Sequence, residues 1–116
     1  MKKKKEIISE NYLERIPVPN GNLRWKSDED GKITLLIENT GFFNKMAQKF
    51  FKKPKTTFVH LDDMGSFIWP LMDGERDIIE IGKLVQGHFG EAANPLYERL
   101  AKFFKVLESY NFIEWK

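Results

Sequence analysis

The sequence predicts an α+β fold, in which a small three-stranded antiparallel sheet is followed by a three-helix, winged-helix-like bundle. Two observations support this fold class. Short segments with alternating apolar residues come first along the chain, and three segments with apolar residues at helical spacing follow. The 116 residues suffice for one domain, 1–116, and a hydrophobic fraction of 41% with ten Phe is typical of a folded protein.

The chain begins with a basic segment, 1–10, which is expected to be a mobile tail. Apolar residues within 12–16 then anchor a short irregular lead-in before two prolines. Residues 23–27 and 32–38 predict two strands of a hairpin, because a polar turn that ends in Gly31 separates them. The second strand presents one buried face, made of Ile33, Leu35 and Ile37.

An extra basic helix is predicted at 41–55, between the second and third strands. Its apolar residues recur at helical spacing with lysines on the opposite side, and the helix ends before Pro54. The β-rich segment 56–61 predicts the third strand.

Three helices complete the prediction. The first begins at the N-cap Asp62 and ends at 73–74. The second begins at Asp77, where the spacing to Glu80 matches a capping box, and weakens toward its glycines. The third begins near Pro95, and the residues after it, 112–115, are expected to form a short extended tail.

Side chains suited to catalysis or metal binding are scarce. The chain has no cysteine, which excludes disulfides and thiolate metal sites. Neither His60 nor His88 has metal-ligand spacing, and Asp62 with Asp63 is explained by helix capping. We therefore expect no enzyme activity, no cofactor and no metal. The chain has no signal peptide and no apolar run long enough for a membrane span, so a cytoplasmic location is expected.

The net charge is only +2, which is a weak argument for nucleic-acid binding. The lysines are nevertheless unevenly spread, and residues 41–55 contain no acidic residue. This cluster could attract an acidic peptide or an enzyme, rest on an anionic membrane surface, or form a solvated face. It consists of Lys45, Lys49, Lys52, Lys53 and Lys55.

The stretch from Leu61 to Gly90 resembles the PqqD family, the peptide chaperones of pyrroloquinoline quinone synthesis, and the wider precursor-peptide recognition domains of ribosomally made, modified peptides. The features that carry the resemblance are Leu61–Asp62, Phe67–Ile68–Trp69, Asp73–Gly74, Ile78–Ile81, and the helix that leads to Phe112–Ile113. Two features depart from the family pattern, namely Pro70 inside the first helix and the basic insert Phe42–Lys53.

The resemblance implies a non-catalytic adaptor that binds the leader segment of a precursor peptide and presents it to a modifying enzyme, often a radical S-adenosylmethionine protein. The peptide would add as a strand beside the third strand, next to a wall formed by the third helix. The implied edge is Thr57, Phe58, Val59, His60 and Leu61. The implied wall is Tyr97, Ala101, Phe104 and Glu108, although Tyr97 and Phe104 could equally belong to a wide core face.

Two other functions stay open. A DNA-binding winged helix is possible because the last two helices resemble a helix-turn-helix, but the second of them carries aromatic residues and charges of both signs. Salt-dependent binding to duplex DNA would favour this alternative. A small enzyme or ligand carrier is the other alternative. The sequence does not identify the precursor peptide, the modifying enzyme, the product or the oligomeric state.

Overall fold

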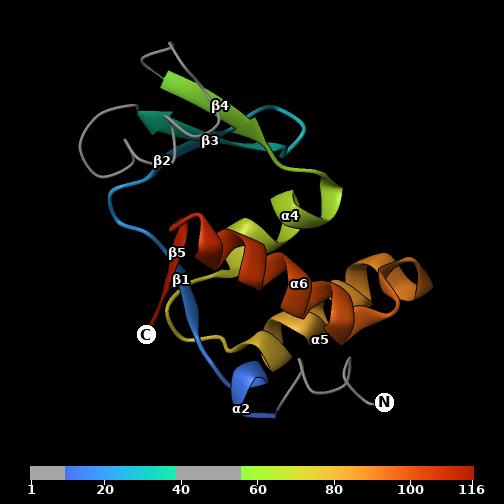
Figure 1. The fold of residues 1–116 in the computed structure, drawn as a ribbon. Helices are drawn as coiled ribbons and strands as arrows, with labels where there is room; N and C mark the ends of the chain where they lie inside the picture. Colours follow the sequence, from blue (N-terminus) through green and yellow to red (C-terminus); the bar gives the residue numbers. More distant parts are fainter. Residues whose placement is uncertain (1–9, 39–55) are drawn as a thin grey trace.

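The computed structural model describes residues 10–38 and 56–116 (Figure 1). Its elements, in chain order, are α2 (Glu10–Leu13), β1 (Pro17–Pro19), β2 (Arg24–Ser27), β3 (Ile33–Glu38), β4 (Thr56–His60), α4 (Asp63–Ile68), the 3-10 turn η2 (Trp69–Leu71), α5 (Ile78–Phe89), the 3-10 turn η3 (Gly90–Ala93), α6 (Leu96–Ser109) and β5 (Ile113–Trp115). The predicted basic helix at 41–55 and most of the predicted tail lie outside the described residues. Glu10, which the prediction placed in that tail, is the first residue of α2.

The main sheet has the order β2-β3-β4, and both strand pairs are antiparallel. This confirms the three predicted strands and the hairpin turn at 28–31. In the central strand, Leu35 lies opposite Trp25 on one side and Val59 on the other. Its inward face is buried as predicted, because the alternating side chains of a strand point to opposite faces of the sheet.

The helices begin where the sequence predicts. The Asp62 carboxylate accepts a hydrogen bond from the Gly65 N–H at 2.8 Å. Asp77 and Glu80 form the full capping box, with bonds of 2.9 and 3.0 Å. Pro70 changes the end of the first helix, since a proline lacks the N–H that an α-helix needs there. The chain continues as the 3-10 turn η2.

A second, two-stranded sheet joins the ends of the described chain, and the sequence prediction missed it. β1 pairs antiparallel with β5, which the sequence indicated only as a short extended tail. The Asn20 side chain strengthens the junction by donating to the Asn111 carbonyl oxygen at 2.8 Å. Partners this far apart in sequence leave no local pattern, because a three-residue strand carries too little periodicity to be recognised.

The helices lie below the main sheet in Figure 1, and the β1–β5 sheet stands at their side. The core fills the space between these layers. Its largest side chains without solvent exposure include Trp69, Phe104, Leu35, Ile68, Ile78 and Leu100. Leu84, which has the helical spacing of a core residue, is instead 41% exposed.

Candidate functional site

The outer edge of β4 is a candidate binding site, because its backbone groups alternate in direction. The Leu61 N–H donates to the Ile33 carbonyl oxygen at 2.9 Å, so residue 61 faces β3. In an antiparallel ladder every second residue faces the same neighbour. The N–H and C=O groups of Thr56, Phe58 and His60 therefore point away from β3. Within residues 10–38 and 56–116, no further strand pairs with this side of β4.

The two edges of the main sheet differ in composition. β2, at the opposite edge, carries Arg24 and Lys26, and Arg24 forms an ion pair with Glu38 at 2.6 Å. Charged residues on an edge strand discourage pairing with another chain. β4 has the sequence TTFVH, which contains neither a lysine nor an acidic residue nor a proline. The β4 edge is therefore the one that lacks these protective residues.

The side chains of β4 divide between two faces. Thr57, Val59 and Leu61 are on the core side, where Thr57 is buried and the other two are partly buried. Phe58 and His60 are on the outer face, where Phe58 is 52% exposed. Two contacts hold the side chains of His60 and Phe58 on the outer face. The His60 Nδ1 lies 2.9 Å from the Thr34 hydroxyl oxygen, and the Lys26 ammonium lies 5.7 Å from the centre of the Phe58 ring.

Thr57 holds a polar atom that the described residues leave without a partner. Its hydroxyl oxygen is buried and makes no hydrogen bond within the described part of the chain. A buried hydroxyl without a partner costs free energy, since it has lost its bonds to water. Thr57 therefore places an unsatisfied donor and acceptor next to the open edge.

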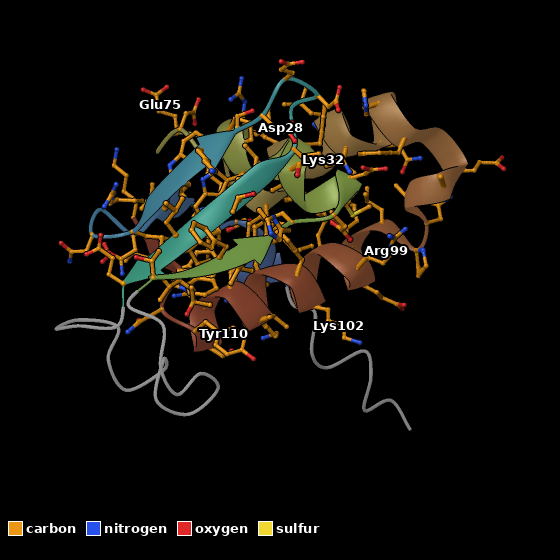
Figure 2. All side chains as sticks on the ribbon, turned by 90° about the horizontal axis from the view of Figure 1, so that it is seen from above. Asp28, Lys32, Glu75, Arg99, Lys102 and Tyr110 are labelled. Atoms are coloured by element: carbon orange, nitrogen blue, oxygen red, sulfur yellow. The ribbon has the colours of Figure 1, made fainter. Side chains whose placement is uncertain are left out.

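The helix α6 runs below the sheet and along the open-edge side of β4, as the view from above shows (Figure 2). Phe103 lies against α4 and close to Leu61, the residue that follows β4, because a side-chain carbon at Gly65 would lie 3.2 Å from the Phe103 ring and 3.3 Å from the Leu61 Cβ. Tyr97 faces α5, because a side-chain carbon at Gly82 would lie only 2.7 Å from its ring. These two contacts fix the rotation of α6 about its axis.

The four residues of the predicted wall lie at different positions around α6. Ala101 and Phe104 are 1% and 0% exposed and belong to the core, as the broad-core alternative allowed. Tyr97 packs on α5, and Glu108 lies close enough to Tyr12 to raise the pKa of its phenol. Phe103, which lies near Leu61, shares one face of α6 with Val106 and, at helical spacing, Tyr110. Val106 is 45% exposed.

Two helix-interior glycines could have indicated this rotation from the sequence. Gly65 and Gly82 each lie where another helix approaches closely, which is a common reason for glycine within a helix. The predicted lysine cluster between 45 and 55 lies outside the described residues.

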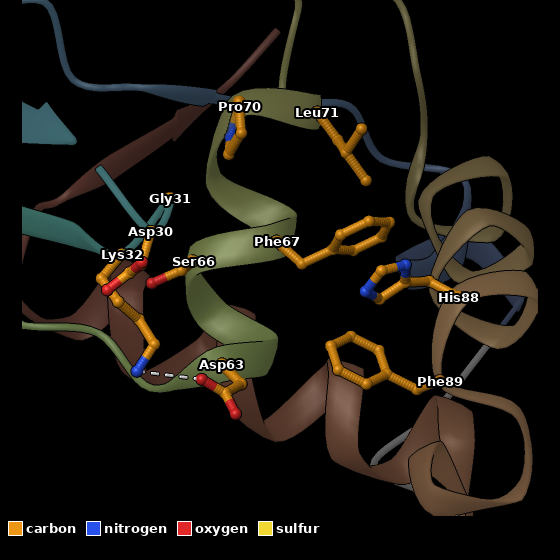
Figure 3. A pocket seen from close by; sticks show the side chains of 10 residues that line it. All are labelled: Asp30, Gly31, Lys32, Asp63, Ser66, Phe67, Pro70, Leu71, His88 and Phe89. Atoms are coloured by element: carbon orange, nitrogen blue, oxygen red, sulfur yellow. Dashed lines mark ion pairs between the residues drawn. The ribbon is translucent and has the colours of Figure 1, made fainter. Parts of the chain in front are cut away.

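A separate pocket of about 460 Å³ lies over the outer face of α4 (Figure 3). Its other walls are the β2–β3 turn and the C-terminal end of α5. The rings of Phe67 and His88 stack in it at 4.3 Å with an interplanar angle of 13°, and Phe89 meets both edge-on. An ion pair between Lys32 and Asp63, at 3.0 Å, borders the pocket.

The described residues hold no group of three His, Asp or Glu side chains that could bind a metal ion. None of the described helices has the length and apolar character of a membrane span.

The family model for coenzyme PQQ synthesis protein D (PqqD) matches residues 50–113, which is more than half of the chain. The chain belongs to the PqqD family. PqqD proteins form a family of precursor-peptide recognition domains, bind precursor peptides for the synthesis of modified peptides or of pyrroloquinoline quinone, and are generally non-catalytic chaperones. The PqqD match includes both β4 and α6. Comparisons with curated proteins and with solved structures give no match.

Proposed function

We propose that this chain captures the leader segment of a ribosomally made precursor peptide by adding it as a strand to β4, and presents it to a modifying enzyme of the radical S-adenosylmethionine type. The chain itself performs no catalysis. The observation that carries the proposal is the outer edge of β4, which has outward backbone groups and no charged or proline residue. Membership in a family that binds precursor peptides supports it.

The leader would form hydrogen bonds with the outward N–H and C=O groups of Thr56, Phe58 and His60. Each backbone bond contributes a net of about 0.5–1.5 kcal/mol. Micromolar affinity corresponds to about 8 kcal/mol after the entropy of association is lost, so these bonds need help from apolar side chains.

Alternate leader side chains would supply that help on two faces. Those on the core side lie against Val59, Leu61, Phe103 and Val106, and one polar group there can satisfy the Thr57 hydroxyl. Those on the outer face lie beside Phe58 and His60. The lysines between 45 and 55 remain candidates for contact with acidic leader residues.

Hydrogen–deuterium exchange followed by NMR tests this proposal. The probe is a set of synthetic peptides that tile the short open reading frame encoded nearest to this gene. In the free protein, the Phe58 and His60 amides should exchange much faster than those of Val59 and Leu61, which face β3. Addition of the leader peptide should slow Phe58 and His60 selectively.

Two results would count against strand addition. One is a leader peptide that binds without protecting the Phe58 and His60 amides. The other is protection of both amides in the free monomer, since the edge would then already be paired. Salt-dependent binding to duplex DNA, with no binding of any peptide, would support the winged-helix alternative instead.

A further inference from the structure

The pocket over α4 lies on a different side of that helix from the β4 edge. Asp63, Ser66, Phe67 and Pro70 line the pocket at i, i+3, i+4 and i+7 spacing, so they share one face of the helix turn and its continuation. Gly65, which approaches Phe103 and Leu61, points roughly 150° away from that face. A ligand in this pocket and a strand on β4 can therefore be bound at the same time.

One wall of the pocket is aromatic. Phe67, His88 and Phe89 converge from α4 and from the end of α5, as Figure 3 shows. Phe67 and Phe89 are partly buried and His88 is exposed, so the stacked rings remain accessible from the pocket. A planar cation binds well against such rings, because their faces carry partial negative charge.

The rim is acidic, although the whole chain has a net charge of +2. Two carboxylates, those of Asp30 and Asp63, line the pocket together with one lysine, Lys32. The C-terminal end of α5 adds the partial negative charge that a helix carries at this end. Lys32 and Asp63 form an exposed ion pair, which contributes little and can exchange for a better-matched cation.

We infer that this pocket binds an arginine side chain of the modifying enzyme, with the guanidinium stacked on the Phe67–His88 wall and paired to Asp63. Arginine fits because its planar group stacks on aromatic rings and pairs with carboxylates, whereas the lysine ammonium is compact and strongly hydrated. The identity of the partner rests on the proposed adaptor function. The pocket chemistry does not, since it follows from the residues that line the pocket.

The first test uses three capped tripeptides, Gly-Arg-Gly, Gly-Lys-Gly and Gly-citrulline-Gly, titrated into the full chain and followed by amide chemical shifts. Citrulline has the shape of arginine without its charge. The arginine peptide should shift the amides of Asp63, Phe67, His88 and Phe89 saturably, and more strongly than the lysine peptide. Equal shifts for arginine and citrulline, or no saturable shift at these amides, would overturn the inference.

The variant Asp63→Asn should weaken arginine-peptide binding by about twofold to fivefold, as expected for loss of one exposed ion pair. His88→Ala should also weaken it, because the stack loses one ring. Glu75→Gln removes the same charge from an exposed site outside the pocket and serves as the matched control. An equal loss in Glu75→Gln would mean that only net charge matters and would contradict the inference.

The second test measures affinity for a purified radical S-adenosylmethionine enzyme that modifies the bound precursor peptide. Asp63→Asn should weaken enzyme binding and leave the affinity for the leader peptide unchanged. Unchanged enzyme binding in Asp63→Asn and His88→Ala would contradict the assignment of the pocket to enzyme docking. The proposal of strand addition to β4 would not be affected. If no leader peptide binds, the proposed function fails, and the tripeptide titration still decides what the pocket binds.

Discussion

The rotation of α6 decides which of its side chains lie beside β4, and Gly82→Ala tests it. A methyl group at this position would lie 2.7 Å from the Tyr97 ring and 3.1 Å from the Leu100 side chain. Contacts shorter than 3.0 Å force a neighbour to move. Because Leu100 is fully buried, we expect strain to remain after Tyr97 shifts.

The magnitude follows from two opposing effects. Alanine in place of glycine within a helix stabilises by about 1 kcal/mol. Forcing an extra carbon into a filled site costs about 1–3 kcal/mol. The expected net result is a loss of about 1 kcal/mol in the free energy of unfolding, measured by urea denaturation.

Gly87→Ala is the matched control, because Gly87 belongs to the same helix and nothing lies within 4 Å of the added carbon. It should stabilise the protein by up to about 1 kcal/mol. The double variant Gly82→Ala with Tyr97→Ala should lose less stability than the sum of the single changes, since removing the ring relieves the overlap. If Gly82→Ala stabilises as much as Gly87→Ala, the Tyr97 ring does not lie against α5. The rotation of α6 derived from that contact is then wrong.

Three further predictions concern individual side chains. Thr57→Val should raise the free energy of unfolding by up to about 1 kcal/mol in urea, because it removes a buried hydroxyl that has no partner among the described residues. Asp77→Ala should lower it by about 1 kcal/mol, because the capping box is lost. Burial, together with Glu108, raises the pKa of Tyr12 to about 12. Its contribution to stability is therefore complete below pH 10 and is lost as the pH rises from 10 to 12, by on the order of 2 kcal/mol.

Each of these predictions has an outcome that would contradict it. A loss of stability in Thr57→Val would show that the hydroxyl is hydrogen-bonded. An unchanged Asp77→Ala would mean that the cap contributes nothing to folding. For the alkaline transition, Tyr12→Phe should reduce the loss of stability between pH 10 and 12, and a variant that retains the full slope would assign it to another group.

The local features of the fold could be predicted from the sequence. The alternation in β3, the caps at Asp62 and Asp77 and the turn at 28–31 all depend on residues within one turn or strand. Pro70 likewise carried its own signal, because a proline in the interior of a helix lacks the N–H that the next helical hydrogen bond needs.

The candidate site was predicted only in part. The β-rich segment 56–61 identified the edge strand, but apolar spacing on α6 was compatible with several rotations of that helix. The sequence prediction chose the stripe that runs through Phe104, which the structure buries in the core. The pairing of β1 with β5 was missed for a related reason, since both strands are too short to be recognised alone.

The sequence by itself determined the strands β2, β3 and β4, the starts of α4, α5 and α6, and the absence of lysine and acidic residues from β4. Only the tertiary structure decided that β4 lies at an edge of the main sheet and that Phe104 is buried in the core, whereas Phe103 lies near Leu61 at the end of β4. The physical reason is that periodicity and capping act over a few residues. Sheet order and helix rotation depend on which distant surfaces pack together, and here the close approaches at Gly65 and Gly82 fix the rotation of α6.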